Sequence, residues 1–222
     1  MLSTRLLSAA LAFASFCGAE EAVRSKMEII LERQDAKGWS RVEPTLVLGS
    51  GDTLRFRFKS NFDGYLYVTN LGTSGQYNLL FPRQETGLRN VVKANQEYMV
   101  PATNASFKVA GPEGYESVYW LISPVALGGL PDLKPAASSS IARPTMKPRC
   151  DDTTFRARGL CLDPGAGPRS IGKDEAVPRE FNRLGVTSRE LTVVQQGDRT
   201  VVSPSGGKAS APVLYEFRIA HK

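Results

Sequence analysis

One segment of this chain, residues 51–82, alternates apolar and charged side chains so regularly that it restricts the fold to a β architecture. The run TLRFRFK places three apolar residues on one face of an extended chain and three cations on the other. These are Leu54, Phe56 and Phe58 against Arg55, Arg57 and Lys59. The following NFDG can reverse the chain, and YLYVTN has the aromatic and β-branched content of a returning strand. The segment predicts a β-hairpin and contains no catalytic motif.

Further strand-like segments recur on both sides of this block. They are residues 27–33, 39–42, 91–101, 106–112 and 116–124. Short strands separated by Gly, Pro and Asn signals, without a convincing helical period, favour an antiparallel β-sandwich. Besides Leu54, Phe56 and Phe58 of TLRFRFK, the side chains expected to point into the core are Leu66, Val68, Phe107, Val109, Val118, Trp120 and Ile122.

The first 19 residues have the features of a cleavable signal peptide. A short positive start precedes the apolar run LLSAALAFASF, which is too short to span a bilayer, and Cys-Gly-Ala supplies small residues before the expected cleavage after Ala19. A lipoprotein signal at Cys17 is the alternative, but Phe16 before it is not the small residue that such a signal needs. We therefore expect an exported protein, periplasmic or extracellular, with no transmembrane segment in the mature chain.

The mature chain divides into three parts. Residues 20–126 are expected to form the sandwich, and residues 127–189 a Pro/Ala/Ser-rich, irregular linker that contains a disulfide loop. Residues 190–222 contain three strand-like runs, the last of which alternates Val213, Tyr215, Phe217 and Ile219 with other residues. Because so few strands are marginal alone, these C-terminal strands are expected to pack on the sandwich and complete it.

The cysteine count agrees with export. Cys17 leaves with the signal peptide, so Cys150 and Cys161 remain as an even pair, for which a disulfide is the natural interpretation. A metal site or a redox pair is the alternative, but there is no CxxC spacing and no nearby histidine.

Charge indicates no nucleic-acid partner. The full chain has a net charge of +6, and removal of Arg5 with the signal peptide leaves about +5. The cations are scattered without a polybasic block or a recognition helix, which is typical of a solvated surface.

The chain also resembles a known bacterial family. The motifs GDTLRFRF, DGYLYVTN, LLFP and FKVAGPEGYESVYWLIS, together with the spaced residues from Asn90 to Pro101, are similar to those of domain of unknown function 4384. This resemblance spans residues 51–124. It implies an immunoglobulin-like β-sandwich in exported or envelope-associated proteins, and it implies no established reaction and no catalytic residues.

Residues suited to catalysis are few. The sole histidine, His221, is next to last and is expected on a frayed terminus, which disfavours a Ser-His-Asp or Cys-His arrangement. The pairs Asp151-Asp152 and Asp174-Glu175 lie in expected loops without the burial that tunes acids in a glycosidase, and they lack calcium-loop spacing. We therefore expect no catalytic residues, no cofactor and no metal site.

Exposed aromatic residues beside arginines would suit a glycan or peptide surface. The candidates are Tyr65, Tyr67, Tyr119, Arg55 and Arg57. The competing interpretation, which we favour, is that both faces of the central strand are covered, the outer one by the C-terminal strands.

These observations favour a non-enzymatic, exported interaction or accessory module at the bacterial cell envelope, with an envelope protein as partner. A polysaccharide-binding module is the first alternative, and an envelope enzyme with an unrecognised site is the second.

Overall fold

The computed structural model describes residues 25–128, 146–171, 181, 191–197, 199–204 and 212–222. Two antiparallel sheets pack face to face as a β-sandwich, which confirms the predicted fold class. The expected signal peptide, residues 1–19, lies outside the described residues, as does most of the Pro/Ala/Ser-rich part of the predicted linker. No helix in the described ranges is long and apolar enough to cross a membrane.

The first sheet has seven strands in the main order β11-β12-β1-β3-β7, with β2 paired to β1 and β8 paired to β3. Its strands are β1 (Met27–Asp35), β2 (Gly38–Arg41), β3 (Thr53–Ser60), β7 (Glu97–Val100), β8 (Phe107–Lys108), β11 (Leu191–Gln196) and β12 (Arg199–Pro204). Strands β7 and β8 pair with successive parts of β3, so together they form one edge of this sheet.

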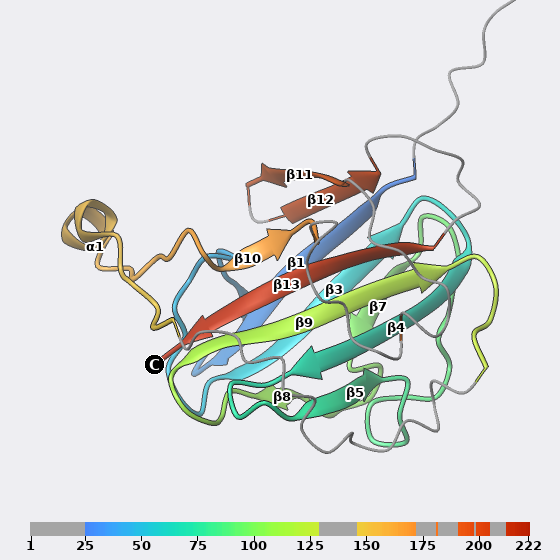
Figure 1. The fold of residues 1–222 in the computed structure, drawn as a ribbon, viewed down its shortest axis with the longest axis horizontal. Coiled ribbons are helices and arrows are strands. Elements are labelled where there is room, and N and C mark those ends of the chain that lie inside the picture. Colours follow the sequence, from blue (N-terminus) through green and yellow to red (C-terminus); the bar gives the residue numbers. More distant parts are fainter. Residues whose placement is uncertain (1–24, 129–145, 172–180, 182–190, 198, 205–211) are drawn as a thin grey trace, which may run out of the picture.

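The second sheet has six strands in the main order β10-β13-β9-β4-β5, with β6 paired to β4. Its strands are β4 (Gly64–Leu71), β5 (Tyr77–Phe81), β6 (Val91–Val92), β9 (Gly114–Ser123), β10 (Gly167–Arg169) and β13 (Val213–His221). In Figure 1 β13, β9 and β4 run side by side in front of β1 and β3.

The predicted hairpin of residues 51–82 is wrong in its pairing. Strand β3 pairs with β1, β7 and β8, whereas β4 pairs with β9, β5 and β6, so the turn between β3 and β4 crosses from one sheet to the other. Alternation correctly identified the buried face of each strand. It carries no information about whether a turn leads to a neighbour in the same sheet or in the facing one.

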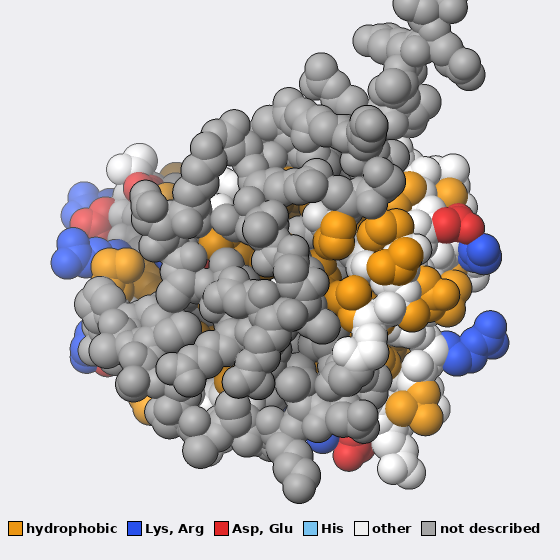
Figure 2. Space-filling view, turned by 45° about the vertical axis from the view of Figure 1, so that its right-hand side comes forward, with side chains coloured by type: hydrophobic (Ala, Val, Ile, Leu, Met, Phe, Trp, Pro, Cys, Tyr) orange, Lys and Arg blue, Asp and Glu red, His pale blue; other side chains and the backbone are white. Residues whose placement is uncertain are grey.

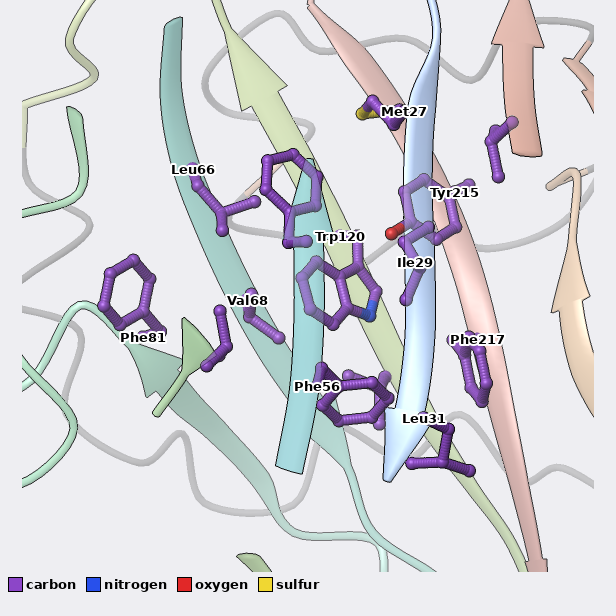
Figure 3. Close-up of a cluster of buried hydrophobic side chains, with 14 of the residues drawn as sticks. Met27, Ile29, Leu31, Phe56, Leu66, Val68, Phe81, Trp120, Tyr215 and Phe217 are labelled. Atoms are coloured by element: carbon purple, nitrogen blue, oxygen red, sulfur yellow. The ribbon is translucent and has the colours of Figure 1, made fainter. Parts of the chain in front are cut away.

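The core between the sheets contains every inward position expected from the sequence, with Phe107 partly buried. Trp120 lies at its centre (Figure 3). Its indole stacks between Phe58 and Tyr215, with ring centroids 5.8 and 6.1 Å away, and meets the edge of Phe56 at 5.0 Å. Such aromatic contacts contribute beyond the area they bury.

The C-terminal strands are integral to this sandwich. Strand β13 inserts between β9 and β10, and its four alternating residues 213, 215, 217 and 219 all join the core. Strands β11 and β12 form a hairpin whose turn contains Gly197 at φ 62°, and β12 pairs with β1. The C-terminal strands therefore pack on the sandwich as expected, with β13 in the middle of a sheet.

The described part of the predicted linker is more ordered than expected. A short helix, α1 (Asp152–Arg158), lies inside the disulfide loop and projects from the sandwich in Figure 1. Asp151, the first residue of the Asp151-Asp152 pair considered above, caps the N-terminus of this helix by accepting a hydrogen bond from the Thr154 amide at 2.6 Å. Strand β10 then pairs with β13. Residues 146–171 are therefore partly built into the fold.

Candidate functional site

The predicted ligand surface is divided between opposite sides of the sandwich. Tyr65 and Tyr67 belong to β4 and Tyr119 to β9, in the second sheet, whereas Arg55 and Arg57 belong to β3, in the first sheet. Because the inner faces pack together, the outward side chains of the two sheets face away from each other. The structure does not bring the tyrosines to the arginines, and a single surface made by all five is wrong.

The tyrosines mostly serve a second apolar cluster on the outer face of the second sheet. Tyr119 and Tyr67 are 0% and 2% exposed, and Tyr65 is partly buried beside them. The cover comes from Ile171 and Phe181, whose ring lies 6.4 Å from that of Tyr119. The favoured expectation that this face is covered is therefore met for Tyr67 and Tyr119, but the covering residues come from the predicted linker instead of the C-terminal strands.

The two arginines form an ion-pair network on the outer face of the first sheet. The buried carboxylate of Glu32 accepts hydrogen bonds from Nε of Arg55 and Nε of Arg57, both at 2.6 Å. Arg57 also donates to Glu97 at 2.7 Å, and the Arg55 guanidinium lies 4.3 Å from the centre of the Trp39 ring. Burial raises the pKa of Glu32, but the two arginines outweigh burial and hold the pKa below its ordinary value. These arginines are engaged within the molecule.

Charge elsewhere is also dispersed. In Figure 2, described charged side chains lie toward the margins of the view, while hydrophobic ones gather in its right half.

On the second sheet, the buried Glu216 accepts hydrogen bonds from Ser117, Arg169 and Arg218 at 2.6, 2.7 and 3.1 Å. This carboxylate joins β9, β10 and β13. It therefore has a structural role that the alternation in β13 did not predict.

A cleft of about 420 Å³ lies between the sheets, where the edge strands β5 and β8 approach each other. One wall is apolar and comes mainly from the first sheet and the segment after it: Leu54, Phe56, Phe107 and Val109. The other wall comes from the second sheet and combines the polar residues Asn70, Asn78 and Glu116 with the apolar Leu80, Val118 and Ile219. The cleft therefore has one apolar wall and one mixed wall.

The polar residues of the cleft arise because inward-facing positions of the second sheet change from apolar to polar at this end. Asn70 has the same strand parity as the core residues Leu66 and Val68, and Glu116 has that of Val118 and Trp120. Both polar side chains therefore point between the sheets. This was the signal that the sequence interpretation missed: a polar residue at an inward position of a strand whose other inward residues are apolar.

Glu116 is the most connected group of the cleft. Its carboxylate accepts hydrogen bonds from Asn70 Nδ2 at 2.7 Å, the Thr73 amide at 3.2 Å and the Thr73 hydroxyl at 3.3 Å, and His221 Nε2 lies 3.5 Å away. Burial raises the pKa of Glu116, but His221, Asn70 and Thr73 together outweigh burial and lower the pKa below its ordinary value. The carboxylate is therefore ionised at neutral pH.

The contact with Glu116 also fixes the orientation of Asn70. An ionised carboxylate only accepts hydrogen bonds, so the amide must turn its Nδ2 donor toward it. The Asn70 Oδ1 acceptor is left buried with no hydrogen-bond partner among the described residues. Buried polar atoms are nearly always paired, so the unpaired Oδ1 of this cleft-lining residue leaves one hydrogen bond to be made.

His221 is not frayed, contrary to expectation. It is 1% exposed, pairs with Gly114 at the end of β13, and forms a parallel bridge with Leu48. Its Nε2 has no hydrogen-bond partner in the described part of the chain, and the Glu116 Oε1 atom lies 3.5 Å from it. Sequence position alone misplaced it, because the terminal strand lies inside a sheet.

The Cys150–Cys161 disulfide is present, as predicted. It closes the loop that carries α1, none of whose residues is buried. The end of this loop is tied to the segment before β3, because the Val47 amide donates a hydrogen bond to the Cys161 carbonyl at 2.8 Å. Within the described ranges, no group of three or more His, Cys, Asp or Glu residues is arranged to hold a metal ion.

Comparison with known protein families gives one match. Residues 47–126 match the model described as "Domain of unknown function (DUF4384)", which confirms the resemblance inferred from residues 51–124. The match covers less than half of the 222-residue chain. It includes all the lining residues of the cleft except Ile219. No curated protein and no solved structure matches the chain.

Proposed function

We propose that this protein is a non-enzymatic, exported interaction module at the bacterial cell envelope, and that it holds its protein partner in the cleft between β5 and β8. The observation that carries the proposal is the unpaired, buried Oδ1 of Asn70 in the lining of that cleft. A partner that supplies a hydrogen-bond donor would complete the mixed wall, while its apolar groups would contact Leu54 and Phe107. Pockets that combine an apolar lining with a few oriented polar groups are typical ligand sites.

The arrangement of the cleft favours binding over hydrolysis by paired acids. A glycosidase mechanism requires two carboxyl groups on either side of the reacting bond. The described lining of the cleft contributes one, Glu116, and its oxygens are already engaged by Asn70 and Thr73. A carboxylate fixed in this way serves recognition well, because its position is set before a ligand arrives.

The compartment is supported by the disulfide. A Cys150–Cys161 bond persists in an oxidising environment such as the periplasm or the extracellular space. This agrees with export through the signal peptide expected at residues 1–19.

The polysaccharide alternative has less support. A glycan platform requires Tyr65, Tyr67 and Tyr119 to be exposed together. Two of these side chains, Tyr67 and Tyr119, are buried. We therefore retain the protein-binding proposal.

Site-specific photo-crosslinking in cells tests it. A photoreactive amino acid replaces Ser106, an exposed residue of the cleft lining, and in a control it replaces Arg156, an exposed residue of α1. We expect a discrete protein adduct from position 106 and none from position 156. The additional substitution Asn78→Phe, which narrows the cleft, should suppress the adduct while far-UV circular dichroism shows an intact β fold. The absence of a protein adduct at position 106, or an adduct that survives the narrowing of the cleft, would contradict the proposal.

A further inference from the structure

The cleft contains an ionised carboxylate with few cationic neighbours. His221 Nε2 lies 3.5 Å from the Glu116 carboxylate, and this imidazole is positively charged only when it is protonated. Lys108 also lines the cleft but is exposed. The Glu116 side chain is only 14% exposed, and a mostly buried carboxylate attracts a cation more strongly than one in water, because the effective dielectric constant is lower.

The unpaired group beside it accepts hydrogen bonds. Asn70 Oδ1 and the carboxylate oxygens of Glu116 can only accept, so a fitting ligand group must donate. An ammonium or guanidinium group carries several donors and no acceptor, and it also supplies the positive charge. The polar part of the mixed wall is therefore complementary to the head group of a lysine or an arginine.

The opposite wall suits the rest of such a side chain. Leu54, Phe107 and Val109 line the cleft across from the polar residues. Lysine and arginine combine an aliphatic stem with a charged end, and the stem commonly lies along apolar surface. A cleft with one apolar wall and with acceptors on the other matches that division within one side chain.

The position of the cleft indicates a polypeptide source. It lies between β5, an edge strand of the second sheet, and β8, an edge strand of the first sheet. Edge strands are the elements to which an extended segment of another protein adds, with alternate side chains entering adjacent pockets. A segment running along either edge could direct one side chain inward.

We propose that the cleft receives a lysine or arginine side chain of an extended partner segment, with its stem on Leu54 and Phe107 and its head group on Glu116 and Asn70. This inference rests on the proposed function, because it names the chemistry of the partner in the same site.

A peptide titration monitored by NMR tests the charge requirement. The probes are acetylated and amidated pentapeptides Thr-Val-X-Val-Thr in which X is lysine, arginine or the uncharged norleucine, and n-butylammonium serves as a free cation. We expect the lysine and arginine peptides to shift the Asn70 side-chain amide and the β5 and β8 backbone amides. They should bind about 10-fold or more tightly than the norleucine peptide, as a charge-assisted hydrogen bond implies.

Three variants assign the effect to the site. Glu116→Gln should remove the preference for lysine over norleucine, whereas Glu113→Gln, at an exposed residue outside the cleft lining, should keep it. Asn78→Phe should weaken binding of every peptide, which gives a second test should Glu116→Gln fold poorly.

The outcomes separate the two proposals. Equal binding of lysine and norleucine peptides in the cleft would overturn the cation inference and leave the binding module in place. Equal binding of n-butylammonium and the lysine peptide would overturn the polypeptide source. No shift of cleft resonances by any probe would also overturn the inference, while the crosslinking at position 106 tests the function independently.

Discussion

Truncation of Phe217 to alanine tests whether the C-terminal strand is part of the core. Phe217 has no exposed surface, and its ring lies 5.5 Å from that of Phe56 at an interplanar angle of 79°. Its removal leaves a cavity between the sheets that the surrounding aromatic rings cannot fill without moving. Buried Phe→Ala changes of this kind cost about 3–5 kcal/mol.

That cost is large against the stability of a domain. Natural domains unfold with about 5–15 kcal/mol, and each kcal/mol lowers the melting temperature of a protein of this size by about 2–4 °C. We therefore expect Phe217→Ala to melt about 6–20 °C below the parent protein. Calorimetry gives the melting temperature, and urea unfolding followed by tryptophan fluorescence gives the free energy of unfolding, both on oxidised protein.

Phe155 is the matched control, because it is 51% exposed on α1. Phe155→Ala should change the free energy of unfolding by no more than about 0.5 kcal/mol. The reasoning is refuted if Phe217→Ala unfolds at the same urea concentration as Phe155→Ala, since β13 would then contribute little to the core.

The other predictions concern pH, the disulfide and export. Glu32→Gln should lose about 1.5–3 kcal/mol at neutral pH, as expected for charge-assisted hydrogen bonds. Because the folded-state pKa of Glu32 lies below its ordinary, unfolded-state value, the stabilisation is complete above the unfolded-state pKa and is lost as pH falls through the folded-state pKa; urea midpoints of the two proteins should converge in acid. Replacing Cys150 and Cys161 by serine should cost at most about 3 kcal/mol and speed tryptic cleavage at Arg158, whereas equal cleavage would contradict a constraining role. Intact-mass measurement of the exported protein should give a chain that begins at Glu20, and a mass that includes Met1 or a lipid on Cys17 would show that cleavage was assigned wrongly.

Alternation predicted the strands well because it reflects burial of one face. The apolar residues with inward parity in β3, β4, β9 and β13 fill the core, and the disulfide followed from the even pair of cysteines expected to remain after cleavage of the signal peptide. Pairing was harder to predict. The turn after Ser60 fits a hairpin and a crossover between sheets equally well, since both need only a chain reversal.

The cleft was only partly visible in the sequence. The inward parity of Asn70 and Glu116 could have marked them as unusual polar positions in otherwise apolar strands. Their meeting with His221 could not be read from the sequence, because that residue follows Glu116 at a long distance along the chain. It reaches the site only because β13 pairs with β9.

The sequence by itself determined that this chain forms antiparallel strands with an apolar inner face and a sandwich core, because the spacing of apolar residues sets which face leaves water. Tertiary structure alone decided that Arg55 and Tyr67, close in the chain, lie on opposite outer faces, and that Glu116 and His221, distant in the chain, lie 3.5 Å apart. The physical reason is that burial depends on local alternation, whereas contact between polar groups depends on which strands become neighbours. That choice is made by the packing of the whole core.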